Sequence, residues 1–129
     1  MEAKLYAVRY ANGYLYLFED EPKKSGRNFM SNVSSDCRMA CKEMLPVVRY
    51  DNSPVKLVID PVVDGSIYDS IWVARSVEGK VYFFCEKPDM VDGGIMTSKP
   101  SMQWTGSDIF PELTYENSPV RMRIEGSIL

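Results

Sequence analysis

The chain has 129 residues, of which 45% are hydrophobic, as in ordinary soluble globular proteins. Its formal net charge of −3 argues against a nucleic-acid-binding role, because neutralising phosphates needs a basic surface. The apolar runs are too short to span a bilayer and no signal-peptide pattern opens the chain, so we expect a cytoplasmic protein without a membrane partner.

The residue types available for chemistry are few. Histidine is absent, which removes the commonest metal ligand and the usual general base near neutral pH. Three cysteines (Cys37, Cys41 and Cys85) are too few for a disulfide scaffold and fit a reducing compartment. Cys37 and Cys41 lie one helical turn apart, but a structural zinc site needs four ligands. We therefore expect no metal, no cofactor and no catalytic residue.

The first predicted element is a β-hairpin. Asn12-Gly13 favours a two-residue turn, because both residues tolerate positive φ. That turn places Tyr10 opposite Leu15 on a mostly apolar side, which we expect to face the core. On the other side it places Arg9 opposite Tyr16. Leu5, Ala7 and Phe18 share that second side, so we expect it to be covered as well.

Loops, a helix and two strands are predicted after the hairpin. Residues 23–34 are rich in Ser, Asn and Gly and predict a loop. The segment Ser35 to Leu45 carries an apolar stripe at helical spacing and predicts a helix that ends before Pro46. A strand over residues 47–50, an Asn-Ser-Pro turn and an alternating strand over Val55 to Ile59 follow.

The same pattern returns about 66 residues later. Leu5 to Pro22 aligns with Ile71 to Pro88, which matches Arg9 with Arg75 and Tyr16 with Tyr82. The six residues Tyr50 to Val55 align with Tyr115 to Val120, and five of the six are identical. Because chance gives roughly one identity in twenty positions, this match indicates a tandem duplication. In the second copy we expect Trp72 to face the core, a loop over residues 89–100, a short helical turn before Pro111, and strands over residues 112–115 and 120–124.

The repeat predicts the architecture. A unit of about sixty residues buries too little surface to be comfortably stable alone. We therefore expect a single domain in which repeat one (residues 1–60) and repeat two (residues 71–129), joined by a linker over residues 61–70, share one core about a pseudo-two-fold axis. The predicted fold class is α+β, mainly antiparallel, with a hairpin, a short helix and strands in each repeat.

Two segments carry a family resemblance. They are Leu5 to Phe18 with its glycine turn, and the tail Ser107-Asp108-Ile109-Phe110-Pro111-Glu112-Leu113-Thr114-Tyr115-Glu116-Asn117-Ser118-Pro119. On these segments the chain resembles small uncharacterised proteins encoded by phages and mobile elements of anaerobic gut bacteria. The resemblance implies that this chain is a fused double copy of such a unit. It implies no activity and no functional residues, and the first copy departs from the tail pattern over residues 43–50.

Five side chains are candidate ligand-binding or partner-binding residues: Arg9, Tyr16, Arg75, Tyr82 and Trp104. Arg presents a fork of donors to an anion or a peptide, whereas the alternative is packing of a guanidinium on a phenol across the strands. Trp104 has polar neighbours in sequence, so an exposed indole there would anchor an interface. The acidic residues of the Tyr-acid-Asn-Ser-Pro segments, Asp51 and Glu116, are explained by turn formation.

Three functions follow from these candidates. The preferred hypothesis is a non-enzymatic protein-interaction module of phage or mobile-element origin, whose partner is another protein or a second copy of the chain. The alternative is a small anionic-ligand binder with a pocket between the two repeats, lined by the Arg and Tyr pairs. An enzyme that uses carboxylates is the third, and it lacks an activated group.

Overall fold

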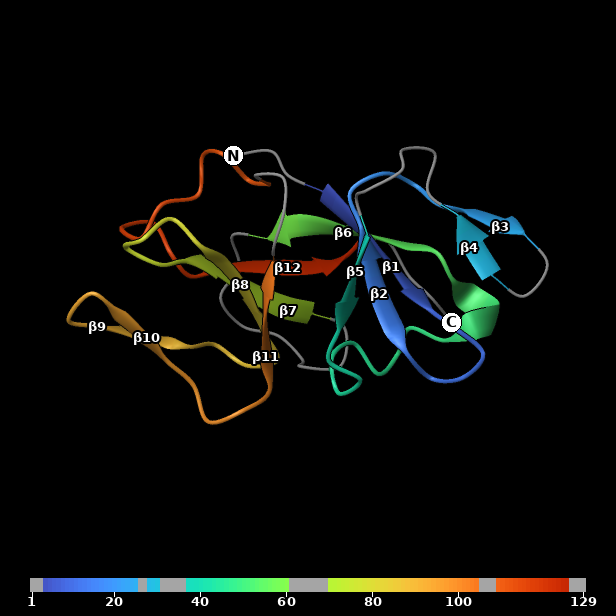
Figure 1. Cartoon of the computed structure of the whole chain (residues 1–129), viewed down its shortest axis with the longest axis horizontal. Coiled ribbons are helices and arrows are strands. Elements are labelled where there is room, and N and C mark those ends of the chain that lie inside the picture. Colours follow the sequence, from blue (N-terminus) through green and yellow to red (C-terminus); the bar gives the residue numbers. More distant parts are fainter. Residues whose placement is uncertain (1–3, 26–27, 31–36, 61–69, 105–108, 126–129) are drawn as a thin grey trace.

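The computed structural model describes residues 4–25, 28–30, 37–60, 70–104 and 109–125 (Figure 1). The described residues are nearly all β, with twelve strands and one three-residue 3-10 turn. The predicted α+β class is therefore wrong. The strands are β1 (Lys4–Arg9), β2 (Leu15–Phe18), β3 (Lys23–Ser25), β4 (Asn28–Met30), β5 (Cys37–Ala40), β6 (Val55–Asp60), β7 (Ser70–Arg75), β8 (Val81–Phe84), β9 (Asp89–Val91), β10 (Gly94–Met96), β11 (Ser101–Trp104) and β12 (Val120–Ile124).

Eight of these strands form one antiparallel, nearly closed, barrel-like sheet. Its order is β11-β8-β7-β12-β6-β1-β2-β5. Each half of the chain supplies four neighbouring strands, and their order away from the centre is the same in both halves: β6-β1-β2-β5 and β12-β7-β8-β11. The two halves meet where β6 pairs with β12. The strands predicted over residues 55–59 and 120–124 are thus confirmed, and they form the centre of the sheet.

The helix predicted from Ser35 to Leu45 is wrong in the part that the structure describes. Cys37–Ala40 is strand β5, which pairs with β2 and places Ala40 opposite Leu15. A short apolar stripe fits either periodicity, and here a neighbouring strand satisfies the backbone instead. The strands predicted over residues 47–50 and 112–115 are also absent, since both segments are turns and bends with one 3-10 turn at Tyr50–Asn52. The segment 61–69 of the predicted linker lies outside the described residues.

The first hairpin has a three-residue loop instead of the predicted two-residue turn. The Gly13 N–H donates to the Tyr10 carbonyl, the Tyr10 N–H donates to the Tyr14 carbonyl, and only Gly13 has positive φ (92°). This is a turn closed by a glycine bulge. It places Arg9 opposite Leu15, so the predicted pairing of Arg9 with Tyr16 is wrong by one residue. The second hairpin repeats this geometry around Gly79 (φ 90°).

Two further hairpins stand where the sequence predicted loops. They are β3–β4 and β9–β10, and each forms a separate two-stranded sheet. In the chain, the first lies between β2 and β5 and the second lies between β8 and β11. In the second one, Val91 pairs with Gly94, and Asp92 (φ 50°) and Gly93 (φ 78°) both adopt the positive φ that a two-residue hairpin turn requires. Asp92-Gly93 is therefore a hairpin signal that the sequence analysis missed.

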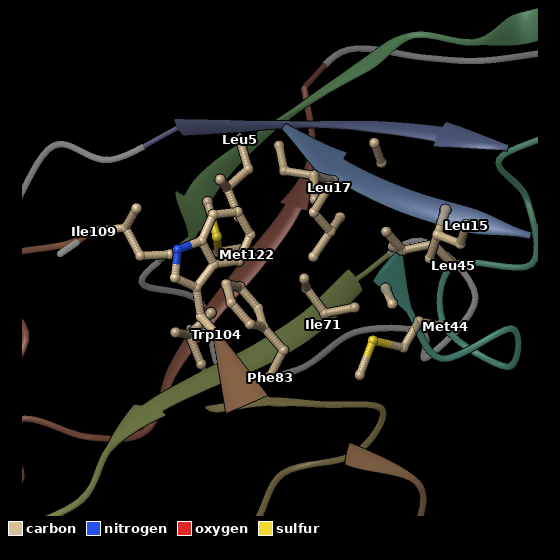
Figure 2. Close-up of a cluster of buried hydrophobic side chains, with 14 of the residues drawn as sticks. Leu5, Leu15, Leu17, Met44, Leu45, Ile71, Phe83, Trp104, Ile109 and Met122 are labelled. Carbon is tan, nitrogen blue, oxygen red and sulfur yellow. The ribbon is translucent and has the colours of Figure 1, made fainter. Parts of the chain in front are cut away.

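The core lies inside the curved sheet and receives side chains from both halves (Figure 2). Members from both halves are at most 1% exposed, among them Leu5, Leu17, Ile71, Phe83 and Met122. The one-residue change of register exchanges the faces of β1 and β7, because neighbouring side chains of a strand point to opposite sides. Trp72, predicted to face the core, is instead half-buried on the outer face, with Lys87 Nζ 5.6 Å from its ring.

Two ion pairs occupy matching positions across the central β6–β12 pairing, and Arg123 Nε lies 3.3 Å from the Asp60 carboxylate as a third contact. Arg121 lies opposite Asp60, and its Nη1 is 2.7 Å from Asp60 Oδ2, with side chains only 7% and 9% exposed. At the other end, Lys56 Nζ lies 3.5 Å from Glu125 Oε2, with side chains 36% and 53% exposed. The first pair is therefore shielded from water and the second is not.

We expect Asp60→Asn to lower the free energy of unfolding by about 3 kcal/mol, because it leaves a buried guanidinium without its carboxylate. The matched control Glu125→Gln removes the exposed pair and should cost less than about 0.5 kcal/mol. Urea denaturation of both variants measures the difference. If both variants lose the same free energy of unfolding, burial does not make the Arg121–Asp60 pair more important for stability than the Lys56–Glu125 pair.

Candidate functional site

Backbone carbonyls surround the side chain of Arg9 at the end of β1. Its Nε donates to the carbonyl of Val48 at 3.0 Å. Its two terminal nitrogens donate at 2.9–3.0 Å to the carbonyls of Gly13, Lys42, Met44 and Leu45. A guanidinium has five N–H groups, so these bonds use all of them. Burial lowers the pKa of Arg9, but a guanidinium stays protonated in proteins, so these bonds remain charge-assisted.

Arg75 holds the corresponding loop of the second half in the same way. Its Nε donates to the carbonyl of Leu113, and its Nη1 donates to that of Gly79, both at 2.6 Å. Its Nη2 donates to the carbonyls of Ile109 and Phe110 at 2.9 and 3.0 Å. Each arginine therefore bonds carbonyls of its own half.

The Asn-Ser-Pro segments complete these loops. The backbone N–H of Arg9 donates to Ser53 Oγ at 2.9 Å, and Ser53 Oγ in turn donates to the carbonyl of Arg49. Asn52 braces the turn by accepting from the Arg49 N–H at 2.7 Å and donating to the Val47 carbonyl at 3.0 Å. The same bonds recur in the second half through Arg75, Thr114, Asn117 and Ser118. The bonds made by these Asn and Ser side chains are those of a turn.

Each arginine also fixes one unusual backbone conformation. Leu45 (φ 50°) and Phe110 (φ 54°) occupy corresponding positions in the left-handed region, which costs a non-glycine residue about 1–2 kcal/mol. Both side chains are buried in the core, at 0% and 6% exposure. The carbonyls of both residues accept from the arginine of their half. The arginine bonds and the burial of the side chain together offset the cost of this conformation.

The hydrogen bonds of Arg9 and Arg75 limit their use in the expected anion site. All five donors of Arg9 and at least four of Arg75 already point at carbonyls, so an anion would have to displace loop backbone to reach them. Asp51 and Glu116 are exposed, and Asp51 pairs with Arg49 at the surface. Within the described residues, no group of three or more Cys, Asp or Glu side chains is placed to hold a metal ion.

Trp104 and the two tyrosines lie in separate environments. Trp104 is 5% exposed, and its ring centroid lies 5.7 Å from that of Phe83. Figure 2 shows the two rings next to each other in the core. Tyr16 and Tyr82 are half-buried on the outer face. The five candidate residues therefore do not converge on one surface, and only the tyrosines reach the outside of the sheet.

The outer face of the first half carries a cluster that the sequence analysis did not single out. It consists of Tyr10, Tyr14, Tyr16 and Met39, which we call the tyrosine face. The ring centroids of Tyr10 and Tyr16 are 4.7 Å apart. Met39 lies opposite Tyr16 on the edge strand β5. Tyr14 is 39% exposed and Met39 is 58% exposed. Val8 and Phe18, both almost fully buried, form the floor beneath Tyr10 and Tyr16.

The second half has different residues at the same places. The hairpin alignment matches Tyr10 with Ser76 and Tyr14 with Lys80, and the strand ladders match Met39 with Gln103. Tyr16 keeps its counterpart, Tyr82. Ala74 replaces Val8 in the floor. The same backbone therefore presents an aromatic surface in one half and a mainly polar surface in the other.

We expect Arg9→Lys to lower the free energy of unfolding by about 2–3 kcal/mol, because an ammonium cannot reach all five carbonyls and leaves some without a donor. Arg49→Lys is the control, since Arg49 is 54% exposed and its variant should change stability by less than about 0.5 kcal/mol. Chemical denaturation measures both effects. A stable Arg9→Lys protein would contradict the structural role of these bonds.

No protein-family model, curated protein or solved structure matches this chain. The resemblance to phage and mobile-element proteins therefore remains a prediction. The structure describes no helix that is long and apolar enough to cross a membrane.

Proposed function

We propose that this protein is a non-enzymatic protein-interaction module that contacts its partner through the tyrosine face. The observation that carries the proposal is the difference between the two halves at matched positions. Ser76, Lys80 and Gln103 show that this fold accepts polar side chains there. The fold therefore does not need aromatic side chains at these positions in the second half, and we take recognition as the reason for them in the first.

The composition of the tyrosine face favours a protein partner. Tyrosine and methionine are enriched at protein interfaces, because they bring large contact area and, for tyrosine, a polar group at the tip. Tyr10 and Tyr16 are already ordered by their mutual contact and by the buried floor, which reduces the entropy lost on binding. The partner would contact this face with aliphatic and aromatic side chains of its own.

Stacking of single-stranded nucleic-acid bases is the other established use of an aromatic sheet face. That use requires a basic groove alongside the rings. The chain carries a net charge of −3, and Lys42 Nζ lies next to the tyrosine face, 4.3 Å from the ring centroid of Tyr14. The charge therefore favours a protein over an oligonucleotide.

The duplication fits the same proposal. Two copies that both contribute to one sheet and one core must each keep the residues that the shared fold needs, such as Arg9 and Arg75. Their outer surfaces are free to differ, and here one copy has become aromatic. In this view the second half supports the fold and the first half provides recognition. We propose that such a module works in the cytoplasm, as the composition suggests.

The test transplants the second half's residues onto the first. The triple variant Tyr10→Ser, Tyr14→Lys and Met39→Gln should keep the fold and weaken partner binding roughly tenfold or more. The matched control Val77→Lys and Met96→Gln removes two apolar side chains that are 61% and 63% exposed elsewhere. Quantitative capture from a native lysate compares both variants with the parent, and light scattering over a concentration series detects self-association.

The proposal predicts that one protein species, or a second copy of the chain, is lost with the triple variant and kept with the control. Equal capture by all three proteins would overturn it, as would a parent protein that stays monomeric and captures nothing. Tyrosine-dependent binding of a single-stranded oligonucleotide would replace it with nucleic-acid recognition. Circular dichroism of the triple variant establishes that the fold survives the exchange.

A further inference from the structure

Two half-buried thiols lie near each other where the two edges of the sheet approach. Cys41 directly follows the edge strand β5, and its Sγ–H donates to the carbonyl of Ser101 on the other edge strand, β11, at 3.4 Å. Ser101 lies opposite Phe84 in the β8–β11 ladder, and Cys85 is the next residue after Phe84. The sulfur of Cys41 is thus beside the strand segment that carries Cys85.

The two side chains also lie on the same side of the sheet. Both pack against the main hydrophobic core, and both are free thiols of intermediate exposure. In an antiparallel ladder, opposed Cα atoms are about 4.5–5.5 Å apart, so Ser101 lies at that distance from Phe84, and Cys85 is the next residue along the chain. The β5 and β11 strands are not paired with each other in the described sheet. The thiols therefore lie on the two sides of a seam that lacks ladder hydrogen bonds in the described sheet, and Cys41 is near enough to act on the electrostatics of Cys85.

We propose that Cys41 and Cys85 form a reversible disulfide that fastens this seam. The oxidant is a low-molecular-weight disulfide such as oxidised glutathione. The Cys41 thiolate attacks one sulfur of that disulfide, which gives a mixed disulfide and releases one glutathione thiolate. The Cys85 thiolate then attacks Cys41 Sγ and releases the second glutathione. Two protein thiols lose two protons and two electrons, and the oxidised glutathione accepts them as two thiols.

The electrostatic surroundings set the rate of this exchange. Burial raises the pKa of Cys85 to about 11, with further contributions from Cys41, Glu43 and Glu86, while Lys99 acts in the opposite direction. Burial and Glu43 also raise the pKa of Cys41. Because thiolates are the attacking species, the exchange is slow at neutral pH and speeds up as the pH rises. A pair of this kind responds to sustained oxidation and not to brief pulses.

The bond would join the two halves of the chain. Cys41 belongs to the first half and Cys85 to the second, 44 positions apart in the sequence. A cross-link over a loop of this length restricts the unfolded chain strongly, and it acts at the seam between the two edge strands. We therefore expect oxidation to raise Tm by roughly 5–10 °C.

The experiment uses the whole protein at pH 8.5 with oxidised glutathione, in a Cys37→Ser background that removes the third thiol. Peptide mapping under non-reducing conditions should show one major product, a Cys41–Cys85 cross-linked peptide that has lost two hydrogen atoms. Cys41→Ser and Cys85→Ser variants should each give only a glutathione adduct on the remaining thiol. Reduction should reverse both the cross-link and the rise in Tm.

Two outcomes would overturn the proposal. One is the accumulation of glutathione adducts on both thiols without a cross-link, which would show that the folded protein keeps the sulfurs apart. The other is a cross-link that lowers Tm, which would show that the bond distorts the seam. The same oxidation in urea gives the reference for an unfolded chain, in which mixed products should dominate. Because the thiols lie on the core side and the tyrosine face lies outside, neither result depends on partner binding.

Discussion

The antiparallel pairing of β6 with β12 is the interaction on which the rest of the structure depends. Each half alone would be a four-stranded sheet with one apolar face exposed to water. Pairing at the centre joins the halves into one sheet whose curvature encloses a shared core. The buried Arg121–Asp60 pair crosses this junction, where a shift of register would leave two charges without partners.

Within each half, one arginine holds an irregular loop that belongs to no strand. Arg9 and Arg75 donate hydrogen bonds to the backbone carbonyls of that loop. Buried carbonyls need such donors. These loops in turn place Leu45 and Phe110 in the core. A recurring Arg therefore marks a structural need that both copies share, and the Asn-Ser-Pro turn recurs because its side chains complete the same loop.

The two halves act as controls for one another. Where both copies keep a residue, as with the hairpin glycines, the fold supplies the reason. Where one copy is aromatic and the other polar on the same outer strands, as with Tyr14 and Lys80, the fold tolerates both and the reason must come from outside it. The proposed recognition by the tyrosine face rests on that comparison, and the proposed disulfide rests on the way in which the two edges of the sheet approach each other.

The sequence alone shows the identities at a fixed spacing, and it predicted the central strands and the presence of the two hairpins, because two-residue alternation and glycine turns are local signals. Only the tertiary structure decided the register of the hairpins, since a glycine bulge adds one residue and exchanges the faces of β1 and β7. The tertiary structure also decided that residues 37–40 form strand β5 and not the expected helix, because pairing with β2 satisfies their backbone hydrogen bonds. Three features depend on residues that are far apart in the chain: the carbonyls that Arg9 bonds, the burial of Trp104, and the tyrosine face. No local sequence pattern brings such residues together.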